Sequence, residues 1–136
     1  MKKITALVLT SLLSLNAQAG FVVIGNPAGV DALSSGEVKQ LFLGKKTQLS
    51  NGQTANLVEL NDGDAQRIAF HDAATGRSES QLQSAWSRLV FTGKAEAPVQ
   101  VADFGAVVST VAADANAIGY IDESALTDGV KVLFKY

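Results

Sequence analysis

The sequence predicts an α/β domain whose mixed, mostly parallel β-sheet is flanked by helices. Short apolar segments of β-forming residues alternate with longer segments in which apolar residues recur at helical spacing. This alternation is typical of parallel sheets, because a helix carries the chain back to the starting end of the next strand. The expected strands are residues 21–24, 55–60, 117–121 and 130–134, and the expected helices are residues 35–43, 65–71, 80–91 and 104–111.

The first strand and the first helix have clear boundaries in the sequence. The apolar strand 21–24 ends at Gly-Asn-Pro, residues 25–27. Ser34, with Glu37 three residues later, forms the capping-box pattern that begins a helix. Gly44 follows the last apolar residue of that helix and is expected to end it in a left-handed conformation.

A turn and a polar loop surround the second strand. Asn-Gly at residues 51–52 is a strong turn signal before the strand. The polar loop 61–64 then leads into the helix 65–71, where we expect Ile68 and Ala69 to face the core.

The last two helices each follow a residue suited to helix capping. Ser80 is the expected N-cap of the helix 80–91, in which Trp86 belongs to an apolar stripe and is expected in the core. Asp103 is expected to cap the helix that begins after it.

Residues 1–19 have the three parts of a cleavable signal peptide. Two lysines at residues 2–3 precede the mainly apolar run 4–15, and Ala-Gln-Ala at residues 17–19 is an A-x-A cleavage site. A membrane anchor is the less favoured alternative, because this run is too short to span about 30 Å of hydrocarbon. We therefore expect residues 20–136 to be exported as a single domain.

The composition narrows the classes of function. The chain has no cysteine, so neither a lipid at the cleavage site nor a disulfide is available. Without residues 1–19, nine basic and thirteen acidic residues remain, a formal charge of −4. An acidic chain without a basic stripe argues against nucleic-acid binding. The expected product is a periplasmic protein that is not anchored to the membrane.

Four segments, taken in order, resemble the substrate-binding subunits of phosphate ABC transporters. The first is Val38-Lys39-Gln40-Leu41-Phe42-Leu43-Gly44-Lys45, which resembles the family's "iFlGk", and the second is the turn Asn51-Gly52. The third is Asp62-Gly63 with Arg67 and Phe70, which resembles "DGSGT-R-x-x-F". The fourth is Val111 with Ala117-Ile118-Gly119-Tyr120-Ile121, which resembles "V…gaIGYv". The resemblance covers roughly residues 37–122 and implies a periplasmic-binding-protein-like fold. Full members of that family have two lobes and more than twice this length, so the chain resembles a short, single-lobe form.

The resemblance also implies a ligand-binding segment between the second strand and the following helix. In the family, backbone N–H groups at this helix start, together with Ser and Thr hydroxyls, donate to phosphate. The family's Arg supplies positive charge, and its Asp accepts the phosphate proton. The candidate ligand-binding residues of this chain are Asn61, Asp62, Gly63, Asp64, Gln66 and Arg67.

The candidate segment departs from the family pattern in its hydroxyl donors. Asp62, Gly63 and Arg67 match, whereas Asp64 and Gln66 stand where the family has Ser and Thr. An unneutralised carboxylate repels a phosphate charge by about 4 kcal/mol at ~4 Å when the dielectric constant is near ~20. In the alternative interpretation, Asp62 or Asp64 only caps the helix, and Arg67 forms a surface ion pair with one of them.

No catalytic constellation or cofactor motif is present in the sequence, and we do not expect an enzyme. His71 is the only histidine, so a metal site with two histidines is excluded. A cation held by Asp62, Asp64 and His71 is a weaker alternative to an exposed His71 on the helix surface.

Two functions remain open from the sequence. The first is a periplasmic solute-binding-like protein, similar to phosphate receptors, that binds phosphate or another small anion weakly. The alternative is a ligand-free interaction module that serves an envelope transporter or sensor. Association of the chain with itself is compatible with both, because a second copy supplies the wall that a single lobe lacks.

Overall fold

The computed structural model describes residues 20–136, so the predicted signal peptide lies outside the described residues. Within them, one β-sheet of five strands is flanked by four α-helices. The elements in chain order are β1 Phe21–Gly25, α1 Ser35–Phe42, β2 Asn56–Leu60, α2 Ala65–Ala74, α3 Glu79–Phe91, β3 Val99–Val101, α4 Phe104–Ala112, β4 Ala117–Asp122, the short 3₁₀ turn η1 Glu123–Ala125 and β5 Lys131–Lys135.

The sheet is mixed, with the strand order β3-β2-β4-β1-β5. Strand β2 pairs in parallel with both β3 and β4, whereas β1 pairs antiparallel with β4 and β5. Four strands therefore run in one direction and only β1 runs in the other. This arrangement confirms the prediction of a mixed, mostly parallel sheet flanked by helices.

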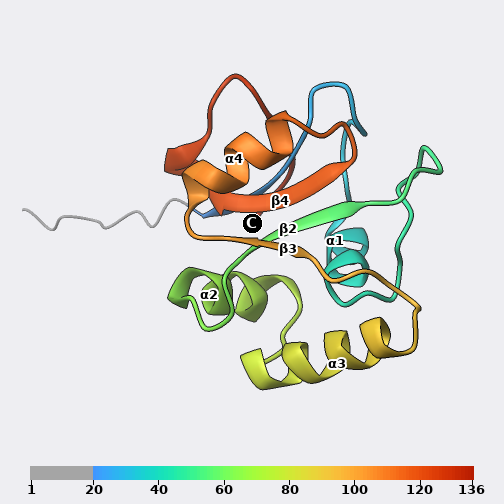
Figure 1. Cartoon of the computed structure of the whole chain (residues 1–136). Helices are drawn as coiled ribbons and strands as arrows, with labels where there is room; N and C mark the ends of the chain where they lie inside the picture. Colours follow the sequence, from blue (N-terminus) through green and yellow to red (C-terminus); the bar gives the residue numbers. More distant parts are fainter. Residues whose placement is uncertain (1–19) are drawn as a thin grey trace, which may run out of the picture.

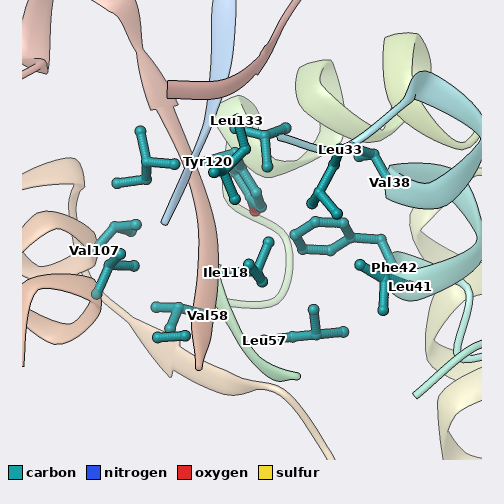
Figure 2. Packing of buried hydrophobic residues seen from close by; sticks show 14 of the residues in the cluster. Leu33, Val38, Leu41, Phe42, Leu57, Val58, Val107, Ile118, Tyr120 and Leu133 are labelled. Atoms are coloured by element: carbon teal, nitrogen blue, oxygen red, sulfur yellow. The ribbon is translucent and has the colours of Figure 1, made fainter. Parts of the chain in front are cut away.

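The helices cover both faces of the sheet. Helix α4 lies on one face, and α1, α2 and α3 lie on the other (Figure 1). Neighbouring residues of β2 point to opposite faces, as the pleat of a strand requires. Val58 lies with Val107 of α4, whereas Leu57 lies toward Phe42 of α1 (Figure 2). The sheet is thus buried on both sides, which is why its central strands are almost entirely apolar.

Most helix starts follow the sequence prediction, with one correction. Ser34 and Glu37 form the expected capping box, and Asp103 caps α4. Helix α3, however, begins after Ser78 and not after Ser80. The Ser78 hydroxyl accepts the N–H of Gln81, and the Gln81 side chain accepts the N–H of Ser78, so this pair satisfies two donors that Ser80 would leave open.

The buried face of α2 differs from the prediction. Ile68 and Ala69 are exposed, and Ile68 retains 45% of its accessible surface. The buried residues of α2 are Arg67, Phe70, His71 and Ala74, which follow the i, i+3, i+4, i+7 spacing of one helical face. The prediction was wrong because two of these four residues are polar and are buried with hydrogen-bonding partners.

Two further features complete the description of the fold. The edge strand β3 was not predicted, because its three residues are too few to show a pattern. Among the described helices, none combines the length and the apolar character needed to cross a bilayer.

Candidate functional site

The six predicted site residues lie together where β2 meets the start of α2. The loop 61–64 turns between these two elements, and Asp64 donates its N–H to the carbonyl of Asn61 at 3.0 Å. Gly63 has a φ of 79°, a left-handed conformation that favours glycine at this turn. The predicted residues that the structure gathers here are Asn61, Asp62, Gly63, Asp64, Gln66 and Arg67.

Asp64 is the N-cap of α2. Its side chain accepts the backbone N–H of Gln66 at 2.8 Å, which satisfies one of the free donors at the helix start. Of the two capping residues considered from the sequence, Asp64 is therefore the one that caps. An external anion that uses the N–H of Gln66 would have to replace that bond.

Arg67 is buried and surrounded by carboxylates. The expected ion pair with Asp62 forms, but Arg67 retains only 3% of its accessible surface and does not lie on the surface. Its Nη2 lies 3.3 Å from Asp62 Oδ1, and its Nη1 lies 3.5 Å from Glu59 Oε2. Its Nε donates to both carboxylate oxygens of Glu79 at 3.1 Å.

These carboxylates determine the charge state of the guanidinium. Burial alone would lower the pKa of Arg67, but the nearby charges of Glu59 and Glu79 raise it above its ordinary value. One fixed positive charge therefore faces three carboxyl groups.

Glu79 occupies the donors that the family resemblance assigned to an external anion. It is the first residue of α3, and its Oε1 accepts the backbone N–H of Gly63 at 3.2 Å and the side-chain amide of Gln83 at 3.0 Å. Burial raises the pKa of Glu79, but hydrogen bonds from Gln83, Arg67 and Gly63 outweigh it and hold the pKa below its ordinary value. An ionised carboxylate of the chain itself thus binds in the loop.

Asp62 connects the loop to the edge of the sheet. Its backbone N–H donates to Gln100 Oε1 at 2.8 Å, and Gln100 Nε2 donates back to Asp62 Oδ1 at 3.1 Å. Gln100 belongs to β3, so this reciprocal pair fixes the loop against the edge strand.

A buried polar cluster lies beneath Arg67. Glu59 has no accessible surface, and its Oε1 accepts the hydroxyl of Tyr120 at 3.0 Å. The same Tyr120 oxygen accepts the backbone N–H of Leu60 at 3.2 Å. Burial and the negative charge of Glu59 raise the pKa of Tyr120. The phenol therefore stays protonated and remains a donor to Glu59.

His71 completes this buried cluster. It was expected on the helix surface, but it has no accessible surface, so that expectation is wrong. Thr75 donates its hydroxyl hydrogen to the His71 carbonyl at 3.1 Å, so the hydroxyl accepts from His71 Nδ1 at 3.1 Å. His71 Nε2 lies 2.6 Å from Glu59 Oε1, so the ring and the buried carboxyl group are joined by a short hydrogen bond.

The geometry does not support the alternative of a bound cation. His71 is held by Glu59 and Thr75, while Asp64 caps α2. Within residues 20–136, no group of three or more histidine, aspartate or glutamate side chains is arranged to hold a metal ion.

A groove of about 460 Å³ opens beside the Asp62–Arg67 loop, between α3 and β3. Glu59, Asp62 and Arg67 line its polar end, and Trp86 and Phe91 are among the residues of its apolar end. A larger groove of about 800 Å³ lies on the other side of Val90 and contains none of the six predicted site residues. We take the smaller groove as the one connected with the site, because the buried charges border it.

The fold occurs in solved structures of phosphate receptors. An ABC-type phosphate transport receptor from Vibrio cholerae matches with a TM-score of 0.56 and 16% identity, over 84% of this chain and 45% of the receptor. A Clostridium perfringens protein assigned as a phosphate ABC transporter substrate-binding protein, with bound phosphate, matches with a TM-score of 0.62 and 24% identity, over 84% and 44%. PstS from Borrelia burgdorferi matches with a TM-score of 0.59 and 11% identity, over 84% and 46%.

These similarities show the fold of the chain. It spans less than half the length of the receptors that it matches, as the predicted single lobe requires. The predicted resemblance to phosphate ABC transporter substrate-binding proteins is therefore confirmed at the level of fold. No family model and no curated protein matches the sequence.

The sequence interpretation missed two of the three carboxylates around Arg67, those of Glu59 and Glu79. Glu59 stands between Val58 and Leu60 in an otherwise apolar run, and a charge in such a run indicates a buried partner. Glu79 carries no comparable signal, because an acidic residue in the first turn of a helix is ordinary.

Proposed function

We propose that this protein is an exported single lobe of the phosphate-receptor type that works in the periplasm as a protein-interaction module, for an envelope transporter or sensor. The observation that carries the proposal is the position of Glu79. Its carboxylate already takes the N–H of Gly63 and the Nε–H of Arg67. The proposed role therefore needs no captured solute.

The local charge supports this proposal. Arg67 faces Glu59, Asp62 and Glu79, so an entering phosphate meets more negative than positive charge. At ~4 Å and an effective dielectric constant of ~20, each uncompensated charge pair contributes about 4 kcal/mol. Phosphate would also have to displace a carboxylate that is part of the chain, and whose effective concentration is therefore high.

The size of the chain supports the proposal as well. The chain covers less than half the length of the solved receptors with this fold, so one lobe presents its loop on an open groove. Polar contacts are weaker in water than in a closed site, because solvent screens them. A protein partner that covers the groove would exclude that solvent.

Calorimetry tests the proposal directly. The full chain is expressed in a Gram-negative host, purified from the periplasmic fraction and titrated with phosphate, with sulfate as a second oxyanion. We expect no heat of binding at millimolar ligand. Micromolar binding of phosphate would overturn the interaction module and establish solute capture.

Weak anion capture is the second candidate, because Gly63 and Arg67 already hold a carboxylate and so retain the ability to bind an oxyanion. Asp64→Ser combined with Gln66→Thr restores the family's hydroxyl donors and removes one negative charge. Millimolar phosphate binding by this variant alone would show that the donors are limiting. Absence of binding would show that Glu79 and the open groove are decisive.

Export is part of the proposal and has its own test. We infer cleavage after Ala19, which leaves Gly20 as the first residue. The intact mass of the purified protein should correspond to residues 20–136. A protein that retains residues 1–19 would contradict the proposed signal peptide.

A further inference from the structure

The two edges of the sheet are protected differently. Edge strand β5 carries Lys131, which pairs with Asp31 at 3.1 Å, and Lys135, which pairs with Glu123 at 2.6 Å. Charged side chains on an edge strand oppose pairing with another chain. The other edge strand, β3, has the uncharged sequence Val-Gln-Val and pairs only with β2 (Figure 1). Strand β3 thus lacks the charged side chains that β5 carries.

Exposed apolar side chains gather beside this unprotected edge. Phe91, the last residue of α3, retains 92% of its accessible surface, while Val90 and Val99 retain 44% and 52%. Val90 and Phe91 both line the smaller groove, and Val90 and Val99 both line the larger one. The three side chains therefore belong to one region of the surface. We call Val90, Phe91 and Val99 the β3-edge patch. A phenylalanine exposed to this degree beside an open edge is typical of an interaction surface.

We propose that the β3-edge patch is the interface of a homodimer, in which two copies of the chain are related by a two-fold axis. The charges at the border of the patch point to a second copy as the occupant. Lys94 and Glu96 are both exposed in the segment between α3 and β3, and neither takes part in an ion pair within residues 20–136. In the proposed dimer Lys94 of each copy faces Glu96 of the other, and the two-fold axis makes this contact twice with the roles exchanged.

The length of the chain points to the same occupant. Solved receptors with this fold match it over 44–46% of their own length, so two copies make a molecule of about their size. The second copy also covers the groove between α3 and β3, whose polar end holds Asp62 and Arg67. This inference goes beyond the proposed function, since it holds whether or not the loop binds an anion.

The mass of the protein in solution tests the dimer. The full chain, purified from the periplasm, is studied by sedimentation equilibrium from micromolar to millimolar concentration. We expect the mass of two chains at the upper end, and the mass of one chain for Phe91→Asp. Val132→Asp is the matched control, because Val132 is an apolar residue of the opposite edge with 38% of its surface exposed, and this variant should stay dimeric. Circular dichroism confirms that both variants are folded.

Charge exchange tests the two-fold arrangement independently of the apolar contact. Lys94→Glu and Glu96→Lys should each weaken dimerisation by about tenfold, because each places like charges together twice. The double variant should recover most of the wild-type affinity.

A wild-type chain that stays monomeric at millimolar concentration would overturn the proposal, as would a Phe91→Asp variant that remains dimeric. A two-fold interface of another geometry is indicated if the double variant is weaker than both single variants, and this result also overturns the proposal.

Discussion

Arg67 donates its Nε–H to both carboxylate oxygens of Glu79 at 3.1 Å, and this contact joins the start of α2 to the start of α3. The same carboxylate accepts the N–H of Gly63 in the preceding loop. A loop with unpaired donors at a helix start ordinarily attracts an anion. Here the next helix supplies that anion from within the chain, so the stability of the fold and the occupancy of the loop depend on one side chain.

Glu79→Gln should separate these two roles. The amide keeps an acceptor for Gly63 but removes the negative charge that opposes an external anion. We expect the variant to bind phosphate in the millimolar range by calorimetry, while the wild-type protein does not. Gln83→Ala is the matched control, because it removes a hydrogen bond to Glu79 and leaves the charge in place. Equal behaviour of Glu79→Gln and the wild-type protein would show that Glu79 is not what excludes phosphate.

Arg67→Met should destabilise the fold strongly. In the wild-type protein, Glu59 Oε2 is buried, has no hydrogen-bond partner and lies 3.5 Å from Arg67 Nη1. The substitution removes this cation and leaves the buried oxygen without it. Breaking one side of a buried ion pair costs about 3–5 kcal/mol. Urea unfolding followed by the fluorescence of Trp86, the only tryptophan, measures the free energy of unfolding.

A second substitution tests the reason for that loss. Glu59→Gln in the Arg67→Met background removes the uncompensated charge and should recover part of the stability, since the two residues are coupled. If the losses from the two single variants simply add, the ion pair is not the cause of the destabilisation.

Acid should weaken the contact between Arg67 and Glu79. The pKa of Glu79 lies below its ordinary value of 4.5, so its ionised form is favoured by folding. The resulting stability is fully present above a pH of about 4.5 and is lost as the pH falls through the lower pKa of the folded state. Wild-type protein should therefore lose more free energy of unfolding than Glu79→Gln does between neutral pH and pH ~3. Parallel pH profiles of the two proteins would contradict the lowered pKa.

The sequence was sufficient to predict the elements that local chemistry determines. Capping boxes, turn glycines and apolar periodicity depend on residues close together in the chain, so α1, β2 and α4 were predicted nearly correctly. The site depends on residues far apart in the chain. Glu59 and Tyr120 are separated by 61 positions, and no local pattern shows that they form a hydrogen bond.

The errors at α2 have the same physical origin. Sequence reasoning put its apolar residues inside and His71 outside, because burying a polar group costs free energy unless a partner satisfies it. The partners of His71 and Arg67 come from β2 and α3, and only the tertiary structure brings them together. The six candidate residues lie together in the loop and the first turn of α2, but the sequence did not show that Glu79 places its carboxylate there.

Gly119→Ala should show how closely α4 packs on the sheet. A Cβ atom at Gly119 would lie 2.7 Å from Val107 Cγ1 and 3.2 Å from Val111 Cγ2, which is closer than packed carbon atoms tolerate. Overpacking of this kind costs about 1–3 kcal/mol, measured by urea unfolding.

Gly36→Ala is the control, because Gly36 lies in α1 with only Ser34 Oγ nearby at 3.9 Å. That substitution should stabilise the protein by about 0.5–1 kcal/mol, since alanine loses less conformational entropy in a helix. Because Val107 is the residue in the way, Val107→Ala should restore stability to Gly119→Ala, whereas on its own it destabilises by leaving a cavity.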